Sequence, residues 1–167
     1  MGNGTTASGT ASTAMGIQTE ATGYTSTAMG RSTDASGTAS TAMGFRTTAS
    51  GYYSTAMGFD ITASDFGSLV IGQYNLLGST LTNSDTQFSI ENTAFVIGNG
   101  VDADNRSDAL TVLFDGTTTI AGDLSINSDA RLKANIISLG STLAKVLQID
   151  GKSVSYTHLT LPTILRV

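Results

Sequence analysis

The sequence predicts an all-β protein, a parallel β-roll solenoid with 14-residue coils whose chains associate into a fibre. The first observation is a run reading STAMG that returns at a fixed interval, with Met15, Met29, Met43 and Met57 each fourteen residues apart. Such a short period means that each unit stacks on its neighbours. The second observation is that the repeats hold few large apolar residues. One chain therefore buries too little surface to offset a backbone entropy cost of about 1–2 kcal/mol per residue, which favours association.

The repeat fills the first part of the chain in five units. Four units are nearly identical, and the fifth, ITASDFGSLVIGQY, keeps the frame while its residues change. The units begin at Thr5, Thr19, Thr33, Thr47 and Ile61. Residues 1–4 also match the end of a unit, so we expect the chain to begin inside a repeat.

Each unit is expected to form two short strands and two bends. Gly9 and Gly16 divide the unit, and glycine reaches positive φ without a steric penalty. Successive coils would pair in parallel at ~4.8 Å, with identical residues above one another. Because side chains alternate along a strand, Thr13 and Met15 share one face and Ala14 takes the other. The sequence leaves open which face lies inside.

The S-x-A-x-G pentad in a 14-residue frame, over residues 1 to 75, resembles the head repeats of trimeric autotransporter adhesins. The resemblance implies a left-handed parallel β-roll and three chains packed about a common axis. The hand follows from the resemblance alone, because the general crossover preference of sheets favours the opposite one.

Residues 76–127 are expected to form a β-rich collar or connector. Asp115-Gly116 indicates a hairpin with a type I′ turn. The segment AFVIGNGVDADNRSDALTVLFDG is similar to the collar before the chaperone of many phage tail-fibre proteins. The alternating runs predict strands at 87–90, 94–97, 109–114, 117–120 and 124–126.

An acidic stretch in the collar superficially resembles a calcium loop. Its oxygen-bearing residues are Asp102, Asp104, Asn105 and Asp108. An EF-hand loop needs an acid or amide where Arg106 stands, so a solvated acidic turn is the preferred interpretation and no metal is assigned.

Residues 128–153 resemble the start of the self-cleaving intramolecular chaperone found at the end of phage endosialidases and tail fibres. The resemblance rests on Asn127 to Ile136, NSDARLKANI. It implies Ser128 as the nucleophile and cleavage site, Lys133 as its general base, and Asp129 and Arg131 as supporting residues. A lysine can act as a base only where burial lowers its pKa, and a spacing of five requires a turn or a contact between subunits.

The chaperone domain is cut short, so we expect this chain not to cleave itself. A helix is predicted from Ser141 to Ile149, with Gly151 as its stop. Residues 154–167 are interpreted as an artefact, because VSYTHLTLPT resembles a translated sequencing adapter. The alternative interpretation is that this segment forms a native β-strand. This segment holds the only histidine, His158.

Composition excludes several functions. The net charge is −5 without a basic stripe, which argues against nucleic-acid binding. No apolar run reaches the ~18–20 residues of a membrane span, so no membrane insertion is expected, and there is no cysteine. No phosphate loop or carboxylate pair suggests a cofactor or a further enzymatic activity.

The function expected first is that of a phage or prophage tail fibre. Such a homotrimer would reside on the virion and bind a host-surface glycan or protein. The alternative is an extracellular bacterial trimeric autotransporter adhesin, and a remote one is an ice-binding solenoid, suggested by the stacked threonines. No residue can be named as a receptor contact.

Overall fold

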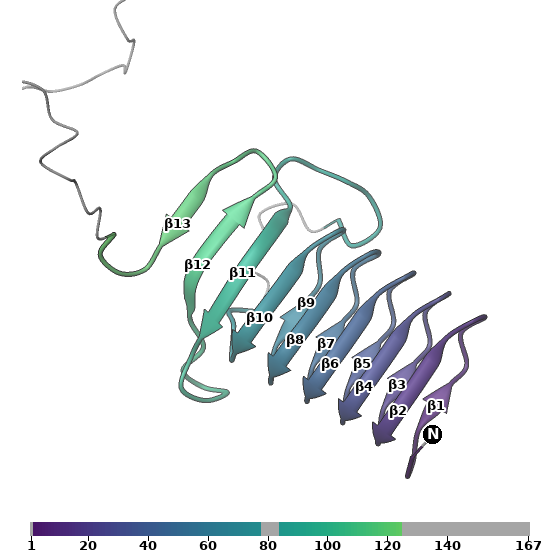
Figure 1. Cartoon of the computed structure of the whole chain (residues 1–167). Helices are drawn as coiled ribbons and strands as arrows, with labels where there is room; N and C mark the ends of the chain where they lie inside the picture. Colours follow the sequence, from purple (N-terminus) through teal and green to yellow (C-terminus); the bar gives the residue numbers. More distant parts are fainter. Residues whose placement is uncertain (1, 78–83, 125–167) are drawn as a thin grey trace, which may run out of the picture. The chain divides into compact units, whose positions relative to one another are not determined.

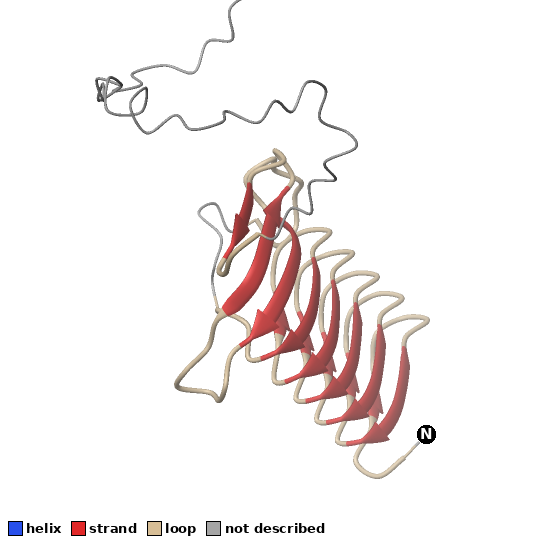
Figure 2. Ribbon diagram, turned by 60° about the vertical axis from the view of Figure 1, so that its left-hand side comes forward, coloured by secondary structure: helices blue, strands red, loops and turns tan. Residues whose placement is uncertain are grey.

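The computed structural model describes residues 2–77 and 84–124, and every regular element in these ranges is a β-strand. Within them, no helix is long and apolar enough to cross a membrane. The strands form a ladder of parallel coils that ends in an antiparallel hairpin (Figures 1 and 2). The helix predicted from Ser141 to Ile149 and residues 128–167 as a whole lie outside the described residues.

Each coil contributes one long and one short strand, so two sheets run along the solenoid. The long sheet has the order β13-β12-β11-β10-β8-β6-β4-β2 and the short sheet the order β1-β3-β5-β7-β9. The long strands of the repeats are β2 (Thr13–Ile17), β4 (Thr27–Arg31), β6 (Thr41–Phe45), β8 (Thr55–Phe59) and β10 (Leu69–Gln73). The short strands are β1 (Thr6–Ala7), β3 (Glu20–Ala21), β5 (Asp34–Ala35), β7 (Thr48–Ala49) and β9 (Thr62–Ala63).

Equivalent residues pair in register between neighbouring coils, as the 14-residue period predicts. Thr13 pairs with Thr27, and Met15 with Met29, in a parallel ladder that repeats from β2 to β10. The expectation of an all-β parallel solenoid with two short strands per coil is therefore confirmed.

The alanine column of the long strands lies inside, and the methionine column lies outside. Ala28 and Ala56 are fully buried, whereas Met15 is 49% exposed and Met57 42%. This answers the question that alternation left open. The interior is filled by small side chains in columns from both sheets. Its fully or almost fully buried members include Ala21, Ala35, Ala49, Ala63, Thr19, Thr33, Thr47, Ser26, Ser40 and Ser54.

The bends do not depend on glycine as expected. A positive φ of 44° to 71° recurs every seven residues, so each coil turns at two left-handed corners. Only two of these residues are glycines: the set is Gly4, Ala11, Gln18, Thr25, Ser32, Ala39, Arg46, Tyr53, Asp60, Gly67 and Tyr74. Neighbouring coils hold the corners, since the Arg46 N–H donates to the carbonyl of Arg31 at 2.9 Å.

The glycine columns serve close stacking instead. Gly16 lies within β2 at φ 126°, and a Cβ there would lie 1.8 Å from the Gly30 carbonyl oxygen. A Cβ on Gly9 would likewise lie 2.0 Å from the carbonyl oxygen of Gly23. Both columns therefore need glycine because the next coil approaches too closely for any side chain.

The long sheet continues beyond the last regular unit. In β11 (Thr93–Asn99), Phe95 pairs in parallel with Leu69 of β10, so residues 95–99 occupy one further rung. β12 (Asp108–Leu113) and β13 (Thr118–Ile120) then pair antiparallel and end the sheet. The strands predicted at 94–97, 109–114 and 117–120 are confirmed within a residue or two. The strand predicted at 87–90 is wrong, because these residues form a bend, an irregular segment and a turn.

The β12–β13 hairpin forms at the predicted place with a different turn. Gly116 has φ 89°, but Asp115 is not left-handed, so the turn is not type I′. Instead the Gly116 N–H donates to the Leu113 carbonyl at 3.0 Å, and the Leu113 N–H to the Thr117 carbonyl at 2.9 Å. This is a three-residue loop with glycine at its left-handed position.

Candidate interaction surface

The outward face of the long sheet is the main apolar surface of the repeats. We call it the methionine face and define it by the outward column Met15, Met29, Met43, Met57 and Ile71. Thr13 and its equivalents stand beside this column on the same face. Met29, Met43 and Ile71 are half-buried by their neighbours, while Met15 and Met57 are more exposed. A continuous apolar stripe thus runs along the solenoid over a core of smaller residues.

An aromatic stack flanks this face at the ends of the long strands. We call this edge of the solenoid the exit corner. Phe45 and Phe59 stack with centroids 5.0 Å apart, and Phe59 meets the Tyr74 ring edge-on at 5.2 Å. A guanidinium closes each end of the stack. Arg31 lies over Phe45 at 5.3 Å and Arg106 over Tyr74 at 5.6 Å.

A second aromatic row flanks the face where the long strands begin, which we call the entry corner. Tyr53 contacts Phe66 edge-on at 5.2 Å, and Phe88 contacts Phe114 at 5.1 Å. Phe66 and Phe88 join the two pairs at 6.5 Å. Two of these rings stay largely exposed, Tyr53 at 57% and Phe88 at 58%.

Charge differs between the two corners. The basic side chains of ranges 2–77 and 84–124 are Arg31, Arg46 and Arg106, and all belong to the exit corner. The exit corner also holds acids, Asp60 beside two of these arginines and Asp102 and Asp104 in the loop that carries Arg106. The segment at the entry corner carries exposed Asp85 and Glu91 without a basic residue. This segment is fixed there because the Tyr52 N–H donates to the Asp85 carbonyl at 2.7 Å.

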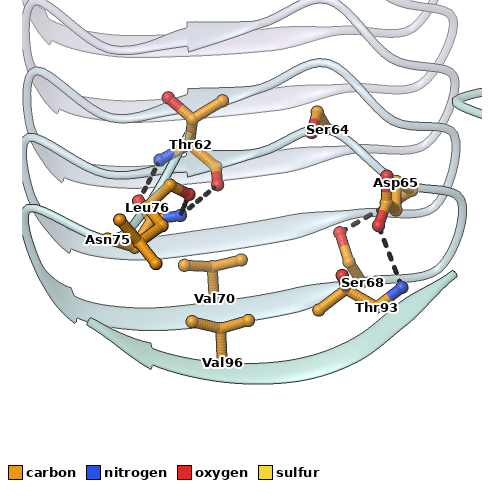
Figure 3. A pocket seen from close by; sticks show the side chains of 9 residues that line it. All are labelled: Thr62, Ser64, Asp65, Ser68, Val70, Asn75, Leu76, Thr93 and Val96. Atoms are coloured by element: carbon orange, nitrogen blue, oxygen red, sulfur yellow. Dashed lines mark hydrogen bonds between the residues drawn. The ribbon is translucent and has the colours of Figure 1, made fainter. Parts of the chain in front are cut away.

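Asn75 closes the short sheet at the end of the last coil. In each earlier coil a short-strand N–H donates to a backbone carbonyl of the next coil, as Thr48 does to Ile61 at 2.9 Å. Thr62 donates instead to Oδ1 of Asn75 at 2.9 Å, and Nδ2 of Asn75 donates back to the Thr62 carbonyl at 3.0 Å (Figure 3). The side-chain amide thereby takes the place of the backbone hydrogen bonds that a further coil would make with Thr62.

Asp65 makes a matching contact on the other side of the coil end. Its Oδ2 accepts from the Thr93 N–H at 2.9 Å, and its carbonyl accepts from Oγ of Ser68 at 2.9 Å (Figure 3). The cavity between these groups measures about 10 Å³, roughly the room that one water needs. Substrate pockets are commonly about 300–1,000 Å³, so this cavity is too small for one.

The acidic stretch of the collar forms a tight local turn. Oδ1 of Asp102 accepts from the backbone N–H groups of Asp104 at 3.0 Å and Asn105 at 2.8 Å. The hydrogen bond from the Asn105 side chain, followed by the backbone bond, lowers the pKa of Asp102. Asp108 faces elsewhere and accepts from the Leu76 N–H at 3.0 Å. In the described part of the chain, no three acidic, histidine or cysteine residues gather as metal ligands.

The structure does not describe the residues that the sequence predicts to take part in autocleavage. Ser128, Asp129, Arg131 and Lys133 all lie outside the described residues, so their roles stay predictions. The two corners were missed by sequence reasoning. Their signal was present, because aromatic and charged residues recur at fixed positions of the 14-residue frame, but only the fold shows that these positions flank one face.

The fold and its surfaces define a parallel β-solenoid with an exposed apolar face along its length. Residues 1–33 and 35–60 match the family model of the YadA head domain repeat in two copies. The matched segments extend from the start of the chain to the end of β8, and they support the resemblance to adhesin head repeats. No curated protein and no solved structure matches the chain.

Proposed function

We propose that this chain is an adhesin-like fibre protein in which three copies pack their methionine faces about a common axis. One observation carries the proposal: in the four regular units the larger apolar side chains lie outside, while the inside holds alanine, serine and threonine. A soluble monomer rarely exposes a long contiguous apolar stripe. Fully burying an exposed methionine contributes about 1.5–3 kcal/mol, and the exposed part of each side chain in this stripe, summed over three chains, adds burial that the small core lacks.

The trimer is tested by placing charge on the proposed axis. In Met29→Lys with Met43→Lys, three chains would bring six ammonium groups together, and we expect the trimer to dissociate. The matched control is Thr6→Lys with Thr48→Lys, which adds the same charge to the outward face of the short sheet. Sedimentation equilibrium compares the two. Loss of the trimer in the control alone, or in neither variant, contradicts the proposed axis.

Within this class we favour a bacterial trimeric autotransporter adhesin that acts outside the cell, exposed on its surface. The match of residues 1–60 to head repeats supports this assignment. Binding of the trimer to immobilised extracellular-matrix proteins tests it, with the Met29→Lys, Met43→Lys variant as a non-assembled control. Binding to bacterial envelopes but not to matrix would support a tail fibre instead. The receptor would be a surface glycan or protein.

The second candidate is the phage tail fibre, favoured by the similarity of residues 127–136 to the chaperone motif. In that case Ser128 would be the nucleophile at which the chain is cleaved, with Lys133 as its base. Intact-mass measurement of the purified chain and of Ser128→Ala tests this role. A cleavage product present only in the unsubstituted chain supports the motif, whereas intact mass for both removes autocleavage from the account.

A further inference from the structure

The entry and exit corners lie at opposite ends of every long strand, and both flank the methionine face. Tyr24 precedes β4 and Arg31 ends it, so the two residues belong to one rung of the ladder. Tyr52 and Phe59 stand in the same relation at β8. Each rung therefore offers a pair of surface groups, one at each corner.

Symmetry decides which corners meet when three copies share an axis. All long strands run in the same sense around the ring, so the end of one strand meets the beginning of the next chain's strand. A rotation about an axis along the solenoid leaves the height of each rung unchanged. Such contacts are heterologous and close after three copies.

We propose that the exit corner of each chain packs against the entry corner of its neighbour, with Arg31 lying over the Tyr24 ring at the rung of β4. This inference rests on the proposed trimer and names its lateral contacts. At the rung of β8 the same rotation sets Phe59 of one chain against Tyr52 of the next.

The exposure of these residues supports the pairing. Tyr24 is 59% exposed, and within the described ranges it makes no ring or cation contact. Arg31 is exposed; Phe45 of the next coil lies 5.3 Å from its guanidinium, and Ile17 of the preceding coil is its register partner. Phe59 is 40% exposed and Tyr52 36%. A cation beside a tyrosine face contributes about 0.5–2 kcal/mol, more as water is excluded.

The arginines of the exit corner differ in whether a carboxylate already holds them. Arg46 and Arg106 both contact Asp60. In the described ranges Arg31 has no such ion pair and contacts only the Phe45 ring. Arg31 is therefore the arginine of this corner that can meet the ring of a neighbouring chain.

Crosslinking tests the pairing cleanly because the chain has no cysteine. Tyr24→Cys with Arg31→Cys is treated with an ethane-bridged bismaleimide and run on a denaturing gel. The two thiols of one chain lie at opposite ends of β4, whose five residues alone span about 13 Å, too far for this short reagent, so every link joins two chains. We expect a covalent trimer. The control is Thr10→Cys with Phe59→Cys, whose rungs differ in height by about 14 Å, and we expect no link there.

Each outcome of this experiment either supports or overturns the corner pairing. Covalent trimers from the Tyr24→Cys, Arg31→Cys variant and not from the control support the pairing. Trimers from both variants, or dimers from Tyr24→Cys as a single substitution, overturn it in favour of non-specific or like-to-like contact. A variant that sediments as a trimer without crosslinking overturns the corner pairing and leaves the proposed trimer standing. A monomer by sedimentation, for this variant and the unsubstituted chain alike, overturns both.

Discussion

Arg106 forms an ion pair with Asp60, 46 residues earlier in the chain, and thereby fastens the β11–β12 loop to the end of the fourth unit. The Arg106 side chain is 16% exposed and that of Asp60 9%. Nη1 of Arg106 also donates to the Asp60 carbonyl at 2.8 Å. A second arginine, Arg46, approaches the same carboxylate at 3.2 Å but is 58% exposed.

The two arginines should therefore differ in their effect on stability. We expect Arg106→Ala to lower the free energy of unfolding by about 3 kcal/mol, because it breaks a largely buried pair. Arg46→Ala, which removes an exposed partner of the same carboxylate, should cost about 1 kcal/mol or less. Urea unfolding at one fixed chain concentration measures both. An equal loss of unfolding free energy in the two variants would contradict the idea that burial sets how much each arginine contributes to stability.

Asn75 gives a second prediction at the end of the short sheet. Asn75→Leu removes the amide that both accepts from and donates to Thr62, and it leaves partly buried backbone groups unpaired. Each unpaired group costs about 1–3 kcal/mol, so we expect a loss of about 2–5 kcal/mol. Asn75→Asp keeps the acceptor and loses the donor, so its stability should lie between those of Asn75→Leu and the unsubstituted chain. Hydrogen exchange at the Thr62 amide should quicken in Asn75→Leu, and unchanged exchange would contradict the capping role.

The stacked glycines give a third prediction. Gly30→Ala places a Cβ 2.0 Å from the Gly44 carbonyl oxygen, at a backbone φ of 124°. Neither backbone can move without shifting the whole ladder, so we expect a cost of about 3 kcal/mol or more. Gly122→Ala is the matched control, since a Cβ there meets nothing within 4 Å. Thermal unfolding should separate the two variants, and similar melting temperatures would refute the close stacking.

Asp34 gives a prediction on pH. Burial raises the pKa of its carboxyl, and the neighbouring Glu20, its partner in the β3–β5 register, raises it further. Because the folded state then binds its proton more tightly than the unfolded state, this group destabilises the fold above its folded pKa. This destabilisation decreases as the pH falls below the folded pKa towards the pKa of the unfolded chain, which is near 3.8.

We therefore expect Asp34→Asn to raise stability at neutral pH by about 0.2–1 kcal/mol, the usual range for a cross-strand pair. The gain should vanish in acid. Melting temperatures of Asp34→Asn and of the unsubstituted chain, measured at neutral and acid pH, check the sign. A gain that is larger in acid would contradict it.

The repeat period predicted the fold because it repeats the same backbone hydrogen bonds and the same buried positions in every coil. It could not predict which residues turn the chain. The left-handed corners fall on Thr25, Tyr53 and similar residues, whose own preferences oppose that conformation. The bonds between coils override those preferences.

The end of the solenoid was harder to predict from the sequence. The last rung, Phe95 to Asn99, follows an insertion that hides its place in the frame, and only the pairing with β10 shows it. The surface was predicted in part: alternation placed Thr13 and Met15 together, but the burial of small alanines decided which side faces outward.

Sedimentation equilibrium of the unsubstituted chain tests the central claim most directly. The account predicts a single species of three times the chain mass, because the methionine face must be covered. A compact species of one chain mass that unfolds cooperatively would show that small side chains alone sustain the solenoid, and would contradict the account.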